Sequence, residues 1–196
     1  MTDSDLVAAL RPVADAFEAL RVRYYLGGSV ASSAHGIARA SLDSDVVAAL
    51  EPEHAEALIA RWTPAYYVPV DRLRAAVAAR SSFSLIHLAT MFKIDVFVSK
   101  GRPFDREAAA RARAQAVDEA PGAPCIPVAS LEDTVLAELE SFRRGGETSE
   151  RQWWDIVGVL KVTPAVDRAY MQRWAGSLGV ADLLDRALAD ATSPDP

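Results

Sequence analysis

The spacing of apolar residues predicts a helix, a strand and a glycine turn at the start of the chain. Residues 5–20 carry apolar side chains at helical intervals, and Pro12 marks either a break or the start of a second helix. A β-prone run from Val22 to Leu26 ends at two glycines, Gly27 and Gly28. Residues 29–36 are small and compatible with a short helix.

A second group of segments begins where acidic and apolar residues alternate. Residues 43–46 predict the start of a buried strand. Pro52 lies where the first turn of a helix accepts proline, and an amphipathic pattern follows it. A short strand at 66–70 and a helix at 71–80 come next.

Two β-prone runs in the middle of the chain predict a hairpin. Residues 82–88 and 92–98 are separated by only a few residues, so an antiparallel connection is the shortest one. The stretch 106–119 is rich in Ala and Arg and has no clear pattern, and 121–130 reads as a turn-rich joint because of its prolines and glycine.

The last third of the chain is helical. Ser130, with Asp133 three residues on, forms a capping box for a helix that ends at Gly145-Gly146. Three more helices are expected near 149–160, 165–177 and 180–191. The composition changes near Ala129, so we expect an α/β domain over 1–129 and a helical domain over 130–196.

Composition limits the classes of protein that fit. The 196 residues include 51% apolar and 24% charged residues, which allows a core and argues against disorder. No apolar run is long enough for a membrane span, and acids near the N-terminus disfavour a secretory signal, so we expect a cytoplasmic protein. A lone cysteine, Cys125, cannot form an internal disulfide. The net charge of −6 weighs against a large nucleic-acid surface.

Three acidic residues are the main candidates for chemistry. Asp43 and Asp45 lie two apart on a predicted strand and therefore point to the same face, where they repel unless a cation lies between them. Oxygen ligands of this kind suit Mg²⁺ or Mn²⁺. Asp95 lies among apolar residues, where a carboxylate is costly unless it is paired or metal-bound. If the two strands are neighbours, three carboxylates meet.

The glycine pair supplies the complementary half of such a site. Gly27 and Gly28 let the backbone approach an anion, the helix start after them favours phosphate, and Ser29 adds a hydroxyl. Each piece also has an ordinary interpretation, a plain turn or a solvated strand edge. Their order and close spacing favour a site for a metal–nucleoside triphosphate.

The segment from Gly27 to Val47 resembles the signature of the DNA polymerase β-type nucleotidyltransferase superfamily. The matching residues are Gly28, Ser29, Arg39, Ser41, Asp43, Asp45 and, on a later strand, Asp95. Residues 130–162 are similar to the C-terminal helices of bacterial minimal nucleotidyltransferases related to the abortive-infection toxin group (AbiEii-like). The resemblance spans about Tyr24 to Val162, which is most of the chain.

This resemblance implies a mixed sheet flanked by helices, with a helical bundle, and transfer of a nucleoside monophosphate from a triphosphate (NTP) to an acceptor hydroxyl. Asp43 and Asp45 would hold Mg²⁺ or Mn²⁺, and Asp95 would bind a second metal ion and help to deprotonate the acceptor. The acceptor could be tRNA, a protein or a small molecule. A toxin role would add an antitoxin protein as partner.

One departure from the family pattern leaves two interpretations open. Glu138 stands where relatives of this branch commonly carry Lys. Either Glu138 points elsewhere, or Lys93 or Lys161 supplies the cation; Lys93 shares a strand face with Asp95. Alternatively the protein binds without catalysis, as a regulatory module. A domain with coincidental acids is the third hypothesis.

Other residues have weaker claims to a role in the site. Arg39 would bind a carboxylate or phosphate, and Asp155 would lie near the nucleotide, although both also read as surface residues. A solvated face is favoured over RNA binding for the local basic stretch of Arg102, Arg106, Arg111 and Arg113. The nucleotide-binding candidates are therefore Gly27, Gly28, Ser29, Arg39, Lys93 and Asp155.

Overall fold

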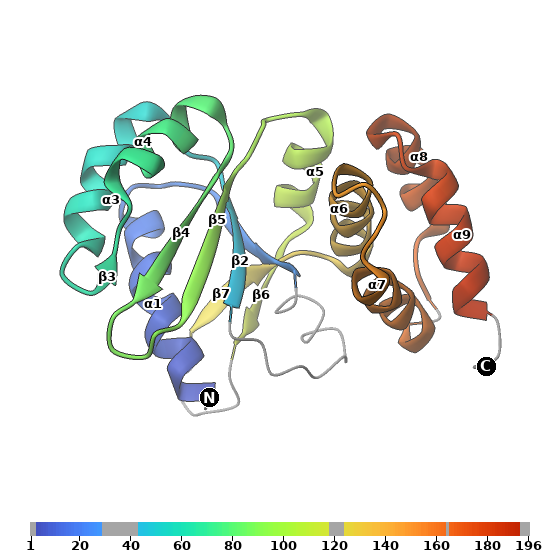
Figure 1. Ribbon diagram of the computed structural model, residues 1–196, viewed down its shortest axis with the longest axis horizontal. Coiled ribbons are helices and arrows are strands. Elements are labelled where there is room, and N and C mark those ends of the chain that lie inside the picture. The colour runs from blue at the N-terminus through green and yellow to red at the C-terminus, as the bar shows by residue number, and fades with distance from the viewer. Residues whose placement is uncertain (1–2, 29–42, 118–123, 164, 193–196) are drawn as a thin grey trace. The chain divides into compact units, whose positions relative to one another are not determined.

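The computed structural model describes residues 3–28, 43–117, 124–163 and 165–192 (Figure 1). They divide into two compact units, one ending at Ala129 and the other beginning at Ser130, and each is described by itself. The short helix expected over 29–36 lies outside the described residues, as do three residues of the expected signature: Ser29, Arg39 and Ser41.

The first unit is built on one mixed seven-stranded sheet with the order β3-β4-β5-β2-β1-β7-β6. Its strands are β1 (Tyr24–Gly27), β2 (Asp43–Ala48), β3 (Tyr66–Tyr67), β4 (Ser82–His87), β5 (Lys93–Val98), β6 (Arg113–Ala116) and β7 (Cys125–Val128). Strand β2 is parallel to β5 and β1 is parallel to β7, whereas the other pairs are antiparallel. The predicted α/β class and the β4–β5 hairpin are both confirmed.

An aromatic cluster joins helices of this unit to one face of the sheet. The helical segments are α1 (Asp3–Ala19), η1 (Pro52–His54), α3 (Ala55–Trp62), α4 (Val70–Ala79) and α5 (Pro103–Arg111). The ring of Phe17 in α1 meets the edge of Trp62 in α3 at 5.5 Å between centroids, and Trp62 lies 6.4 Å from Phe83 in β4. All three side chains are buried, so this is the core side of the sheet.

The period of two along the strands separates a buried face from a more open one. In β2, Ser44, Val46 and Ala48 are buried, whereas Asp43 and Asp45 lie on the opposite face. Strand β5 has the same alternation. The acids therefore share the face away from the aromatic cluster.

The structure differs from, or adds to, the sequence interpretation at three places. Helix α1 continues through Pro12, because losing one backbone hydrogen bond costs less than giving up the packing of buried neighbours such as Val13. The unassigned stretch 106–119 contains the end of α5 and strand β6. The turn-rich joint contains β7, whose side chains Ile126 and Val128 are buried, so burial outweighs the prolines around them.

Other boundaries moved by a few residues. Strand β1 begins at Tyr24 rather than Val22, and the strand expected over 66–70 is only Tyr66–Tyr67 because α4 already begins at Val70. These are shifts of element ends and leave the order of elements unchanged.

The second unit consists, in its described residues, of the four predicted helices: α6 (Leu131–Arg144), α7 (Glu150–Val162), α8 (Arg168–Leu178) and α9 (Ala181–Thr192). Ser130 caps α6 as expected, since its hydroxyl accepts the Asp133 N–H at 3.2 Å. The buried Asp133 carboxylate also accepts from Ser130 and from the Tyr170 hydroxyl, which joins α6 to α8. In the described parts of both units, every helix is too short or too polar to cross a bilayer.

Candidate active site

One row of residues crosses four strands of the sheet where β1 ends and β2 and β5 begin. Gly27 pairs with Asp45, Asp45 pairs with Asp95, and Asp95 pairs with Ser84. Residues paired directly across neighbouring strands point to the same face, and neighbouring strands are about 4.8 Å apart. The condition set by the sequence, that the two acidic strands be neighbours, is therefore met.

Asp43 and Lys93 form the adjacent pair in the same register. Because residues two apart on a strand share a face, Asp43, Asp45, Lys93 and Asp95 make a compact group, which we call the acidic block. The block contains three carboxylates and one ammonium, so it carries an excess of two negative charges at neutral pH.

Both oxygens of Asp95 have hydrogen-bond partners, one inside this block and one on the neighbouring strand β4. The Lys93 ammonium donates to Asp95 Oδ2 at 2.6 Å, and the Ser84 hydroxyl donates to Asp95 Oδ1 at 2.5 Å. The hydrogen bond to Asp95 raises the pKa of the Lys93 ammonium; burial opposes this shift, and the charges of Asp95, Asp43 and Asp45 add to it. All three carboxylates thus act on one cation.

Gly28 brings the backbone against this block. Its φ of 55° lies in the left-handed region, which favours glycine. A Cβ built on Gly28 would lie 1.9 Å from Asp45 Oδ2, far inside contact distance, whereas one built on Gly27 would meet nothing within 4 Å. Gly28 is therefore required for two independent reasons, conformation and space.

The donor chemistry of the acidic block fits a hard divalent cation. Asp43, Asp45 and Asp95 offer only oxygens, on one face of two neighbouring strands, and with the Lys93 ammonium included the formal charge of −2 would be balanced by one divalent ion. Within the ranges that the structure describes, no group of three or more His, Cys, Asp or Glu side chains already stands in a metal-holding arrangement.

Asp155 and Glu138, from the predicted set, lie in the helical unit. Asp155 is half-buried on α7. Glu138 on α6 is also half-buried, and its Oε2 accepts a hydrogen bond from Gln152 Nε2 of α7 at 3.0 Å. The carboxylate of Glu138 thus serves an α6–α7 contact, and both interpretations of Glu138 stay predictions.

Ser84, whose hydroxyl donates to Asp95, was not among the site residues predicted from the sequence. Its signal was present in β4, where Ser82, Ser84 and Ile86 alternate with the buried Phe83 and Leu85. Only the pairing of β4 with β5 turns that alternation into a contact with the acid.

Several arginines of the basic stretch around α5 are held within the chain. Arg102 forms an ion pair with Asp105 at 2.8 Å. Arg106 donates to the carbonyl of Gly101, and Arg113 donates to the carbonyls of Ala110 and Ala112. These arginines are thus engaged by groups of the chain itself, in addition to the solvated face expected from the sequence.

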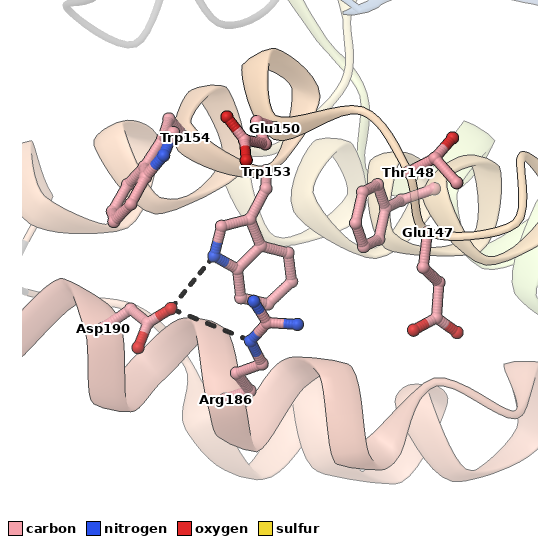
Figure 2. Close-up of a pocket in the computed structure, with 8 residues that line it drawn as sticks. Glu147, Thr148, Glu150, Trp153, Trp154, Arg186 and Asp190 are labelled. Carbon is pink, nitrogen blue, oxygen red and sulfur yellow. Dashed lines mark hydrogen bonds and ion pairs between the residues drawn. The ribbon is translucent and has the colours of Figure 1, made fainter.

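A separate cavity lies within the helical unit and includes none of the predicted site residues (Figure 2). It has a volume of about 240 Å³ and is lined by Phe142, Glu147, Thr148, Glu150, Trp153, Trp154, Arg186 and Asp190. The Trp153 indole N–H donates to Asp190 at 2.9 Å, and the Arg186 guanidinium lies 4.1 Å from the centre of the Trp153 ring. These contacts fasten α7 to α9.

Three similar solved structures are described in terms of nucleotidyl transfer or antibiotic resistance. The antibiotic-resistance factor ANT(2'')-Ia has a TM-score of 0.58 and 13% identity, covering 94% of this chain and 98% of that chain. An antigenic nucleotidyltransferase-like protein from Paracoccidioides brasiliensis has a TM-score of 0.55 and 15% identity, covering 95% and 93%. The lincosamide antibiotic adenylyltransferase LnuA, with lincomycin bound, has a TM-score of 0.46 and 19% identity, covering 83% and 99%.

The first two of these likenesses show the fold. No protein-family model and no curated protein matches the sequence. The mixed sheet and its helices have the architecture of the nucleotidyltransferase-fold neighbours, as the sequence motifs implied. At these levels of identity, a shared fold leaves the activity to be argued from the site.

Proposed function

We propose that this protein is a metal-dependent nucleotidyltransferase that moves a nucleoside monophosphate from an NTP to an acceptor hydroxyl. The observation that carries the proposal is the register of the sheet, in which Gly27, Asp45 and Asp95 are direct neighbours and Gly28 abuts Asp45. This places a glycine turn beside paired acids on one face, which is the geometry needed to hold phosphates next to cations. The neighbours' fold supports the same activity.

Each residue of the site has a specific role in this proposal. Asp43 and Asp45 would hold Mg²⁺ or Mn²⁺, and Asp95 would complete the ligand set and accept the proton of the attacking hydroxyl. Bound divalent ions would stabilise the charge that develops on the entering and leaving oxygens. Gly27 would leave room for the triphosphate and Gly28 would let the backbone turn beside Asp45, with Ser29 and Arg39 contributing hydrogen bonds. Asp155 would lie near the nucleotide.

A labelled-nucleotide assay tests the proposal. The protein is incubated with each α-labelled NTP, Mg²⁺ or Mn²⁺ and pools of acceptors, and transfer of label is followed by chromatography. Asp43→Asn should reduce transfer by about a thousandfold or more, since it removes a ligand from the reacting centre. Asp71→Asn removes the same charge from a fully exposed side chain on α4 and should have no effect. Transfer that survives Asp43→Asn unchanged would contradict the assignment.

A small molecule or a protein is favoured as acceptor over tRNA. The net charge is −6, and Arg102, Arg106 and Arg113 of the basic stretch are held by groups of the chain itself. One similar structure is described as an antibiotic-resistance factor, which makes hydroxylated antibiotics reasonable first acceptors to test. Label appearing on tRNA in preference to small molecules would reverse this order.

We also propose that the enzyme acts as an AbiEii-like toxin. This role requires that expression of the protein slow growth and that an antitoxin relieve the effect. Unaffected growth at good expression, with transfer intact in the assay above, would leave the enzyme without a toxin function.

A second candidate is a nucleotide-binding module without turnover. The contact that favours it is the ion pair between Lys93 Nζ and Asp95 Oδ2, which are 2.6 Å apart. An ammonium at Asp95 Oδ2 competes with a catalytic cation for that oxygen. A binding module would be stabilised thermally by NTP and metal but transfer no label. A domain with coincidental acids would show neither response.

A further inference from the structure

Asp95 is held differently at its two oxygens. Oδ1 accepts from Ser84, a short side chain fixed on the neighbouring strand β4, which pairs with β5 in register. Oδ2 accepts from Lys93, which lies on β5 itself and reaches Asp95 with a long, flexible side chain. One partner is fixed and the other can be withdrawn.

The exposure of the pair supports this difference. The Lys93 side chain is 46% exposed, whereas that of Asp95 is 20% exposed. Lys93 can therefore turn toward solvent at little cost in packing, but Asp95 cannot leave the sheet face with equal ease. A surface ion pair of this kind contributes little to stability, so a competing cation can displace the ammonium.

Repulsion between the carboxylates of the acidic block explains why a cation of the protein itself would be needed there. Three carboxylates share this face of β2 and β5, and like charges side by side on neighbouring strands destabilise the sheet. Lys93 pairs directly with Asp43 in the register and bonds Asp95, so its ammonium reduces the repulsion when no other cation is present.

We propose that Lys93 is a resident counter-ion of the acidic block: its ammonium holds Asp95 Oδ2 in the ligand-free protein and yields that oxygen to an incoming divalent cation, while Ser84 keeps Oδ1 in place throughout. The inference rests on the proposed function. It assigns Ser84 as a positioning residue and gives Lys93 a role different from binding the triphosphate.

Metal binding without nucleotide separates these two roles for Lys93. A counter-ion opposes metal binding whether or not nucleotide is present, whereas a triphosphate ligand affects only nucleotide-dependent binding. The test titrates the protein with Mn²⁺ alone, measuring free Mn²⁺ by electron paramagnetic resonance. Lys93→Met should bind Mn²⁺ on the order of tenfold more tightly than the wild type, because one nearby positive charge is gone. Lys100→Met removes an exposed lysine just after β5 and should leave the affinity unchanged.

The Ser84 part of the proposal has its own pair of variants. Ser84→Ala should weaken Mn²⁺ binding several-fold, because Asp95 loses the bond that orients it, and Ser84→Thr should restore the affinity by returning the hydroxyl. A purely structural role would change the melting temperature in Ser84→Ala but leave the Mn²⁺ affinity as in the wild type, and that result would overturn the assignment.

The outcomes distinguish this inference from the proposed function. An unchanged or weaker Mn²⁺ affinity in Lys93→Met, with label transfer intact, overturns the counter-ion role alone. Absence of Mn²⁺ binding in every variant, together with absence of transfer, overturns the proposed function as well. If Lys93→Met fails to fold, wild-type crystals with and without Mn²⁺ decide: Lys93 Nζ must leave Asp95 Oδ2 only in the crystals with Mn²⁺, and an unbroken contact in both overturns the proposal.

Discussion

Gly28 and Asp45 are so close that a single methyl group on Gly28 would lie 1.9 Å from Asp45 Oδ2. Gly28 directly follows β1, which is antiparallel to β2, and the preceding Gly27 is paired with Asp45. The glycine thus fixes the space available to the carboxylate, and the positive φ of Gly28 makes glycine the favoured residue even without that contact.

Gly28→Ala should therefore damage both the fold and the site. The left-handed conformation alone costs about 1–2 kcal/mol for alanine, and displacement of Asp45 adds to this. Urea unfolding should show the loss of stability, and the thermal response to NTP and Mg²⁺ should disappear. Gly27→Ala is the matched control for the loss of stability, because a Cβ there meets nothing within 4 Å.

A double variant separates the conformational from the steric contribution to the loss of stability in Gly28→Ala. An Asp45→Ala background removes Asp45 Oδ2 and Cγ and leaves only the Cβ, 3.1 Å from the added methyl group, so Gly28→Ala should cost little more than its conformational part. Equal costs in the two backgrounds would show that Asp45 moves aside freely and that the close approach has no energetic weight.

Variants of Glu138 test whether this residue, which stands where relatives commonly carry Lys, affects stability or NTP binding. Because Gln152 bonds its carboxylate, Glu138→Ala and Gln152→Ala should each lower the stability of the protein by about 0.5–1.5 kcal/mol, and the double variant should lose less than the sum. Denaturant unfolding of the four proteins measures this coupling. The affinity for NTP should stay within about twofold; a much tighter NTP affinity in Glu138→Gln would place the carboxylate near the phosphates instead.

The local part of the candidate site could be read from the sequence, and the non-local part could not. Alternation along 43–46 was enough to put Asp43 and Asp45 on one face, because that depends only on the period of a strand. The position of Asp95 depended on which strands pair, and it was predicted only on the condition that they do. The bonds from Ser84 and Lys93 to Asp95 also required the register of three strands.

The same distinction between local and non-local signals explains where the fold differs from the one predicted from the sequence. Proline and glycine dominate the composition near 121–130, yet β7 forms there because it completes the sheet between β1 and β6. Pro12 has poor helix propensity, but buried residues on both sides of it keep α1 intact. The helical unit was predicted well because its caps and apolar spacing are local signals, as with Ser130 at the start of α6.

Ser44 is a site where stability should be gained without loss of function. Its side chain is 1% exposed on the core side of β2, and within the described residues its Oγ has no hydrogen-bond partner. Ser44→Val should stabilise the protein by about 1–2 kcal/mol, since it removes a buried unsatisfied hydroxyl and suits a central strand. The NTP response should not change, because Ser44 points away from Asp43 and Asp45. Ser44→Ala controls for the added volume, and a destabilised Ser44→Ala would reveal a partner for the hydroxyl.

The Tyr66 phenol gives the fold a stability term that is lost at high pH. Burial raises the pKa of Tyr66 above its ordinary value, and the negative charge of Asp15 adds to the shift. A group whose pKa is raised by folding contributes stability that is complete below the unfolded-state pKa, about 10 for tyrosine, and declines as the pH rises above it. At pH 8 the hydrogen bond from Tyr66 to the Ala9 carbonyl should make the wild type about 1 kcal/mol more stable than Tyr66→Phe.

That advantage should shrink as the pH rises. At pH 11, one unit above the unfolded-state pKa, the wild type should have lost about 1.4 kcal/mol relative to Tyr66→Phe, which has no phenol to ionise. Urea unfolding of both proteins between pH 8 and pH 11 measures the difference. Any contribution of Tyr24 to the pH dependence of stability cancels in this comparison, because both proteins retain Tyr24. A constant gap between the two proteins across this range would mean that the Tyr66 phenol ionises equally easily in the folded and unfolded states, contrary to its burial in the core.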